Sequence, residues 1–304
     1  MSLSVKIPSS LTKYKIPLVV NEILTPDLEP KSDEIIFDLT EVTWIDPSGV
    51  AALYNIGKWI DCFPNDNIKV TFKIAEKGTG SFKNKKAMEY LEDCGFFEEF
   101  FGASDIYKEN HAYRTTTLPI RTLGVEQSFS WRYSVLKRWL QASTGRNLEF
   151  SGIQVGVEEI FNNIRDHSNR NIGCVFGQYF PNNDDRLVIT ISDFGLGIPT
   201  VMRQKYGDFK DHELVLKALE EGVSTESTPG NRGAGLPNIM RSLTSNKIGT
   251  VHILTNYAKI VIKDGKVHSA ITTKNFYPGT FFDIEIDINN DKLYEDEEEE
   301  EFTW

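Results

Sequence analysis

The sequence predicts an α/β protein of two domains, and two patterns along the chain carry this prediction. In residues 1–111, short apolar runs alternate with stretches of helical spacing, which is typical of a small α/β domain. In residues 112–290, helices come first and a run of strands comes last. That order favours an α/β sandwich with helices on one face of a mixed, mostly antiparallel sheet. A chain of 304 residues is long enough to bury a core in each domain.

In the first domain, residues 1–33 are weakly patterned and an α/β alternation follows. The expected elements are strands at 35–37, 42–45 and 68–74, a helix after the turn at 46–49, and a helix at 85–94.

The second domain begins with an extended stretch and continues through helices into strands. The expected elements are an extended segment at 117–123, helices at 127–142, 151–167 and 236–243, a hairpin of strands 173–180 and 186–192, and strands at 249–256, 259–264, 266–273 and 280–288. Ser151 and Gln154 have the spacing of a capping box at the start of the second helix.

The composition favours a cytoplasmic protein that binds neither nucleic acid nor membrane. A net charge of -11 argues against the basic face that nucleic-acid binding needs. No apolar stretch has the length of a membrane span, and no secretory signal pattern is present. The three cysteines are far apart, which indicates a reducing compartment without a disulfide framework. The acidic residues at 291–304 predict a disordered tail.

The first segment that suggests chemistry lies in the helix at 151–167. Glu159, Asn163 and His167 are spaced four residues apart, so they share one face beside an apolar stripe. A carboxylate one turn from a carboxamide could act as a general base while Asn163 holds Mg²⁺. A helix with a polar flank is the alternative. Glu158 and Asn162 have the same spacing but point further from the stripe.

Two glycine-rich segments follow. Asp193 ends a strand and precedes Gly195 and Gly197, where the backbone can turn sharply against a flat ligand and the carboxylate can select an amino-bearing base such as adenine. An ordinary turn at a strand end is the alternative. Residues 230–235 precede a helix starting at Leu236, the arrangement of a phosphate cradle, although for this segment taken alone a flexible glycine linker is the better interpretation.

The three segments together, in this order, resemble the ATP-binding family shared by gyrase, heat-shock chaperone ATPases, histidine kinases and mismatch-repair ATPases, known as the GHKL or Bergerat-fold family. The resemblance covers about residues 112–288 and makes ATP and Mg²⁺ the expected cofactors. It implies a lid at 198–230. The residue roles it implies are a base at Glu159, a metal ligand at Asn163, adenine contacts at Asp193, Gly195, Gly197 and Thr280, and phosphate contacts at Gly233, Gly235 and Leu236.

Within that family, Glu159, Asn163 and His167 look closest to the anti-sigma-factor serine kinases. We interpret His167 as a structural histidine. A sensor histidine kinase is disfavoured, because the Asp-His-Glu run at 211–213 lies inside the expected lid, where a phosphoacceptor helix would not sit.

The turn at Asp46, Pro47, Ser48 and Gly49 resembles that of STAS domains in anti-sigma-factor antagonists, over about residues 5–105. In those domains the first residue after the aspartate is a hydroxyl that accepts phosphate. Here that residue is Pro47, which cannot. Asp46 caps the expected helix and Pro47 suits its first position, so this site favours a docking role over phosphorylation. Ser48, in the first turn, stays as the remaining acceptor.

The sequence therefore predicts a STAS-like domain joined to an ATP-binding domain in a regulatory switch. The favoured function is Mg·ATP binding with phosphotransfer to a serine or threonine of a protein partner, or slow ATP hydrolysis. The partner would be regulatory, of the sigma-factor or anti-sigma-factor kind. An ATP-gated binding module without catalysis and a scaffold with a degenerate site are the alternatives, and a homodimer stays open.

Overall fold

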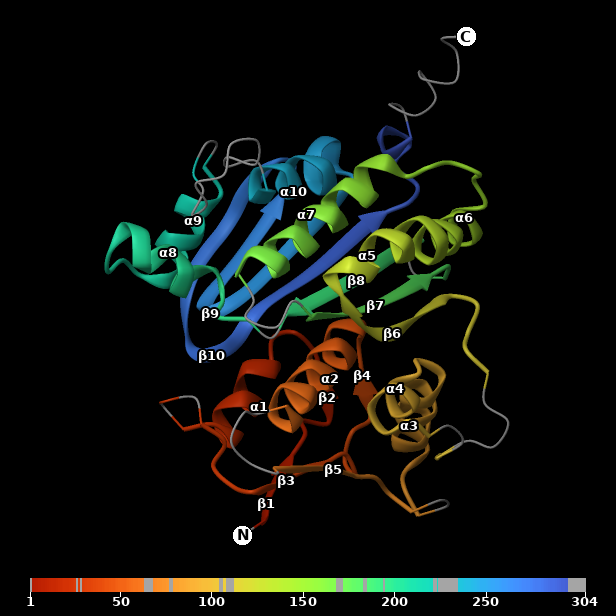
Figure 1. The fold of residues 1–304 in the computed structure, drawn as a ribbon. Helices are drawn as coiled ribbons and strands as arrows, with labels where there is room; N and C mark the ends of the chain where they lie inside the picture. Colours follow the sequence, from red (N-terminus) through yellow and green to blue (C-terminus); the bar gives the residue numbers. More distant parts are fainter. Residues whose placement is uncertain are drawn as a thin grey trace. The chain divides into compact units, whose positions relative to one another are not determined.

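The computed structural model confirms a mixed α/β fold and divides the chain into two compact units (Figure 1). Unit 1 is Met1–Arg121 with Asn275–Tyr277, and unit 2 is Thr122–Lys274 with Pro278–Trp304. The structure describes residues 2–294 apart from 26, 28, 63–67, 77–78, 104–105, 108–111, 168–171, 183–184, 194, 221–222 and 224–234. The domain boundaries expected at 111 and 290 stay predictions, and the acidic tail from residue 295 lies outside the described residues.

Unit 1 is built on a parallel sheet of order β1-β3-β5 beside a two-stranded parallel sheet of β2 and β4. Its elements are β1 Ser2–Lys6, β2 Ser10–Leu11, α1 Ile16–Ile23, β3 Glu34–Asp38, β4 Trp44–Ile45, α2 Pro47–Asp61, β5 Lys69–Lys73, α3 Phe82–Asp93 and α4 Phe96–Phe101. The strands and helices expected after residue 34 are confirmed. The weakly patterned first 33 residues nevertheless hold two strands and a helix; in β1 only Val5 is buried, so its apolar signal is short.

Helix α2 begins as the sequence predicts, and its first turn is closed. The Asp46 carboxylate accepts the Gly49 amide at 2.8 Å, and Pro47 stands at the start of the helix. Ser48 is only 2% exposed; its hydroxyl donates to Asp46 at 2.6 Å and accepts the Lys13 amide at 2.8 Å. Phosphorylation of Ser48 would remove the proton that it donates to Asp46 and bring charge into a buried position. This geometry argues against phosphorylation of Ser48, and the docking role stays a prediction.

Unit 2 contains a five-stranded sheet of order β6-β7-β8-β10-β9. Its elements are β6 Thr117–Gly124, α5 Val125–Trp131, the π-helix η1 Arg132–Leu136, α6 Lys137–Thr144, α7 Ser151–His167, β7 Ile172–Phe180, β8 Arg186–Asp193, α8 Ile198–Tyr206, α9 Asp211–Ala218, α10 Gly235–Thr244, the 3-10 helix η2 Ser245–Lys247, β9 Gly249–Lys263, β10 Lys266–Asp287 and the 3-10 helix η3 Asp291–Leu293. Figure 1 shows α5, α7 and α10 on one face of this sheet, as the order of elements predicts.

The antiparallel register of the central strands assigns their side chains to two faces. Ile189 pairs with Ile284 and Ile191 with Phe282, and these apolar side chains form the core under the helices. Thr190, between them, pairs with Asp283, so these two residues lie on the opposite face. The alternation places chemically different residues on the two faces of β10.

Two local expectations differ from the structure. The four late strands are two long ones, β9 and β10, with a left-handed residue at Asn256 inside β9 that does not end it. Helix α7 starts at Ser151 itself, which makes this residue helical and not the cap. The Gln154 side chain donates to the carbonyl oxygen of Glu149 at 2.5 Å, so the expected capping box is wrong. Phe150, with a φ of 55°, turns the chain into the helix.

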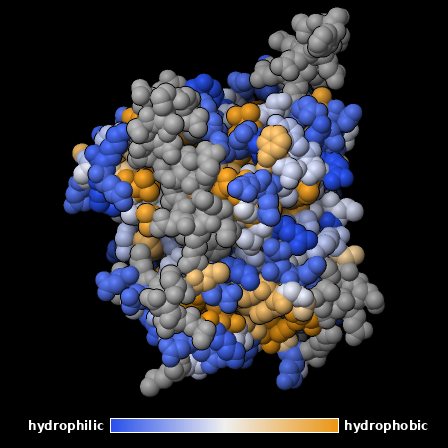
Figure 2. All heavy atoms as spheres, in the orientation of Figure 1, coloured by the Kyte–Doolittle hydropathy of each residue, from blue (hydrophilic) through white to orange (hydrophobic). Residues whose placement is uncertain are grey.

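Among the residues that Figure 2 colours, hydrophilic side chains are interspersed with several groups of hydrophobic ones. Among the described residues, none of the helices combines the length and apolar character that crossing a bilayer requires.

Helices α7 and α10 pack closely because α7 has a glycine at the contact. A Cβ added to Gly156 would lie 2.5 Å from Cγ of the fully buried Leu243, whereas one added to Gly152 would meet the Ser242 carbonyl oxygen at an ordinary 3.4 Å. The approach of the two helices depends on Gly156 and not on Gly152.

We therefore expect opposite effects from two alanine substitutions in one helix. Gly156→Ala should lower the free energy of unfolding by roughly 1–3 kcal/mol through overpacking. Gly152→Ala should leave it unchanged or raise it by up to about 1 kcal/mol through helix propensity. Urea unfolding of the two variants and the parent measures the difference; equal effects would contradict the packing described.

Candidate nucleotide site

The end of strand β8 holds a buried carboxylate in a cage of backbone groups. Asp193 is 7% exposed, and its Oδ1 accepts the amide of Gly195 at 2.5 Å and the amide of Thr280 at 3.2 Å. These donors come from the turn after β8 and from β10. The structure thus brings together three of the residues that the sequence assigned to one adenine contact.

Glycine is required around this carboxylate. Gly279 has a φ of 71°, and a Cβ there would lie 2.5 Å from Asp193 Oδ1 and 3.0 Å from the Gly195 nitrogen. Gly197 has a φ of 83°, and its Cβ would meet Oδ1 of Asn256 at 2.1 Å. Both positions combine left-handed backbone with close approach, so a side chain at either would displace the cage.

Hydroxyl groups that the sequence did not single out support the cage from behind. Thr255 donates to the Gly279 carbonyl oxygen at 2.9 Å, accepts the Ile198 amide at 3.0 Å, and lies 3.1 Å from the Thr280 hydroxyl. Ser192 donates to the Thr280 carbonyl oxygen at 3.2 Å. Thr255 connects the start of α8 to β10 at Gly279 and Thr280, and no sequence pattern around it gave a signal.

Burial sets the electrostatics of Asp193. Loss of solvent raises the pKa of this carboxyl from 3.8 to about 6, and the hydrogen bonds from Gly195 and Thr280 oppose the rise. Ionised Asp193 is therefore held at a cost, and a ligand that donates a hydrogen bond to the carboxylate would reduce that cost.

A second cluster lies where α7 meets the first turn of α10. A Cβ on Gly235 would lie 3.5 Å from Oε2 of Glu159 and 3.7 Å from Oδ1 of Asn163, so both side chains face the start of α10. Asn163 donates its Nδ2 to the carbonyl oxygen of Glu159 at 2.7 Å. Asn238, which the sequence analysis missed, donates its Nδ2 to Oε1 of Glu159 at 3.1 Å. Leu236, expected to contact phosphate, is buried.

The carboxylates of the two carboxylate–amide pairs on α7 have different surroundings. Glu158 forms an ion pair at 3.0 Å with Arg132, whose side chain is 2% exposed, and so serves the packing of η1 against α7. Glu159 faces α10 instead. The preference for Glu159 and Asn163 over Glu158 and Asn162 stays a prediction.

The helix and the strand end that carry the two clusters are close to each other. Gly173 of β7 pairs with Asp193, and a Cβ on Gly173 would lie 2.8 Å from Cδ1 of Ile164. Ile164 follows Asn163 in α7. The C-terminal half of α7 therefore lies against the strand pair that ends at Asp193.

Several expected site residues lie outside the described part of the chain. These are Gly233 with the rest of the loop at 230–234, most of the lid after residue 220, and the side chain of His167. Within the expected lid, residues 198–206 and 211–218 form the helices α8 and α9. Asp211 accepts from Arg203 at 2.6 Å and from the Tyr257 amide at 2.8 Å, which fixes α9 to α8 and β9.

Comparison with known proteins gives little beyond this geometry. No family model matches the chain, and no curated protein matches it. Among solved structures, it is similar to the ATPase region of topoisomerase II of Saccharomyces cerevisiae, with a TM-score of 0.24 and 13% sequence identity. The match covers 45% of this chain and 36% of that one, so the chain spans about a third of that structure's length. At this TM-score the likeness carries no argument.

The raised pKa of Asp193 predicts how stability depends on pH. The folded protein binds a proton more tightly than the unfolded chain, so the contribution of Asp193 is fully present below pH 4 and is lost as the pH rises to about 6. At neutral pH the ionised group costs about 3 kcal/mol.

We expect Asp193→Asn to remove this cost, because the amide oxygen can still accept both backbone hydrogen bonds. The variant without ligand should be more stable than the parent at pH 7 and equal to it or less stable at pH 4. Urea unfolding between pH 4 and 7 measures both. A variant that is less stable at pH 7 would contradict the unfavourable burial of the carboxylate.

Proposed function

We propose that unit 2 binds Mg·ATP, with adenine at the Asp193 cage and the phosphates between α7 and the start of α10. The observation that carries the proposal is the cage itself: a buried carboxylate at a strand end, held by backbone amides, with glycines where a Cβ would clash with the carboxylate and its neighbours. The two backbone donors do not offset the whole cost of burying this carboxylate. The amino group of a ligand would supply a further hydrogen-bond donor to it.

At the base end, recognition follows from hydrogen-bond direction. The exocyclic amino group of adenine donates, and the Asp193 carboxylate accepts. Guanine presents a carbonyl oxygen at the same position, which would face the carboxylate as a second acceptor. The site therefore favours adenine over guanine.

At the phosphate end, the residues present fit Mg²⁺. Asn163 offers a neutral oxygen, a ligand type that Mg²⁺ takes together with waters and phosphate oxygens. The amides at the start of α10, near Gly235, are oriented for phosphate. Bound ATP supplies the γ-phosphoryl group for transfer or hydrolysis.

Glu159 is the proposed general base and Asn238 its positioning residue. The carboxylate would accept a proton from the attacking hydroxyl group or water. Asn238 holds Oε1 at 3.1 Å, which leaves Oε2 on the side of Gly235. The base is thus oriented towards the proposed phosphate position.

We further propose that the acceptor is a serine or threonine of a regulatory protein partner. Unit 1, with its STAS-like turn, is the proposed docking domain and not a phosphoacceptor, because Ser48 is buried and hydrogen-bonded to Asp46. ATP-gated binding without catalysis is the second candidate, and turnover separates the two.

The base-selection proposal predicts a nucleotide preference. Parent protein should bind ATP and bind GTP much more weakly. Asp193→Asn should weaken ATP binding by roughly 1–3 kcal/mol, or about 5- to 150-fold, because an acceptor is replaced by a group that can present a donor. Calorimetry with both nucleotides tests this, and equal affinity of the parent for ATP and GTP would contradict the assignment. The control is the stability of Asp193→Asn: if it stays folded, its weaker ATP binding does not come from unfolding.

The catalytic proposal predicts that two neighbouring substitutions separate binding from turnover. Glu159→Gln should keep Mg·ATP affinity within about threefold and abolish phosphate release or transfer, because a general base acts in the transition state. Asn163→Ala should remove the Mg²⁺-dependent part of binding. Glu158→Gln is the matched control and should turn over like the parent. Parent-like turnover of Glu159→Gln would exclude this base, and no turnover in the parent would leave the ATP-gated module.

A further inference from the structure

We propose that His252, Asp283 and Glu285 form a divalent-metal site, best suited to Zn²⁺, on the face of the unit 2 sheet opposite to the helices. This site is separate from the proposed nucleotide site and does not depend on it.

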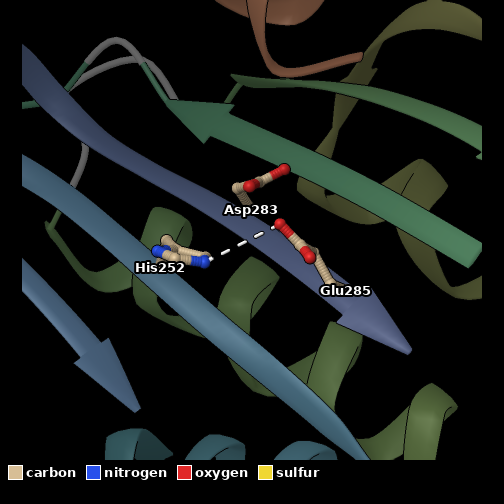
Figure 3. Close-up of side chains that lie close together, drawn as sticks. All are labelled: His252, Asp283 and Glu285. Atoms are coloured by element: carbon tan, nitrogen blue, oxygen red, sulfur yellow. Dashed lines mark ion pairs between the residues drawn. The ribbon is translucent and has the colours of Figure 1, made fainter. Parts of the chain in front are cut away.

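Two neighbouring strands supply the three side chains. Asp283 and Glu285 are two residues apart in β10 and so project from the same face, and His252 comes from β9 beside them. Figure 3 shows all three on one side of the sheet, with helices behind the strands. Asp283 pairs with Thr190, on the face away from the apolar core. Sheet geometry fixes the direction of these side chains before any ion binds.

The ligand atoms are close enough to share one ion. One ligand atom from each residue lies within 4.8 Å of the others, and Nε2 of His252 is 3.7 Å from Oε1 of Glu285. Ligand atoms about 2.1 Å from a tetrahedral ion are about 3.4 Å apart, so small side-chain rotations complete the set. One imidazole and two carboxylates match the nitrogen and oxygen donors that Zn²⁺ takes, with a fourth position for water.

The local charge favours a cation. The carboxylates of Asp283 and Glu285 lie close together here. Arg186 forms an ion pair with Glu285, 3.2 Å from its Oε2. Asp283 is 2% exposed, whereas the side chains of His252 and Glu285 are 12% and 26% exposed. An ion could enter along the more exposed pair and reach the buried carboxylate. Bound there, it would link β9 to β10.

The competing explanation is an ion-pair network in which His252 is protonated and holds the carboxylates without metal. Arg186 separates the two explanations. A guanidinium on Glu285 competes with a metal for that ligand, so Arg186→Gln should tighten Zn²⁺ binding. If the three residues form only an ion-pair network, the same substitution should not raise the affinity for Zn²⁺.

The test is metal binding by the full chain, stripped with chelator and free of nucleotide. Titration with ZnSO₄ should give one ion per chain by calorimetry, and Co²⁺ should give the visible absorption of a four- or five-coordinate ion. Thermal unfolding should move to higher temperature with added Zn²⁺. His252→Gln and Asp283→Asn should each weaken binding by more than about tenfold, since even outer-shell substitutions cost 10- to 100-fold.

His268→Ala is the matched control, because His268 is an exposed histidine on β10 outside the cluster. It should bind Zn²⁺ like the parent, as should Asn163→Ala, which removes the proposed Mg²⁺ ligand. If Asp283→Asn does not fold by circular dichroism, His252→Gln at its more exposed position carries the test. No Zn²⁺ binding by folded parent, or equal loss in His252→Gln and His268→Ala, would overturn the proposal.

Discussion

Burial of the Asp193 carboxylate is the constraint on which the candidate site depends. An ionised group at 7% exposure is unfavourable unless donors surround it, and here the backbone supplies them from Gly195 and Thr280. Backbone can approach so closely only where Gly279 leaves the space of a Cβ empty. The turn after β8 and the part of β10 at Thr280 are therefore fixed together by one side chain. Desolvation raises the pKa of the Asp193 carboxyl, and for the same reason it favours a ligand that donates a hydrogen bond to the carboxylate.

The second constraint is the contact between α7 and α10. Gly156 lets Leu243 approach α7, and this brings Gly235 and Asn238 over Glu159. Because the two helices are rigid, their contact at Gly156 also fixes the distance between Asn238 and Glu159. A base and a cation ligand held on rigid helices keep their geometry better than side chains on loops.

The sequence alone was enough to predict the orientation of residues that belong to a single helix or strand end. The helical period placed Glu159 and Asn163 on one face and Glu158 on another, and strand-end glycines marked the turn after Asp193. It was insufficient where partners come from distant segments. Nothing near Thr255 or Asn238 shows that they support Asp193 and Glu159, because these contacts depend on tertiary packing. The capping-box error has the same origin, since Gln154 found its acceptor in the preceding loop.

Strand alternation explains how β10 can serve two proposed sites without conflict. Thr280 faces the helices together with Phe282 and Ile284, whereas Asp283 and Glu285 face the other way. Three residues along a strand correspond to about 10 Å, and the backbone between them is held by the ladder to β8. Coupling between such sites requires an element with two discrete arrangements, and a fully paired strand has one register. An ion on one face would therefore stabilise β10 as a whole, and with it the position of Thr280, without altering which base Asp193 selects.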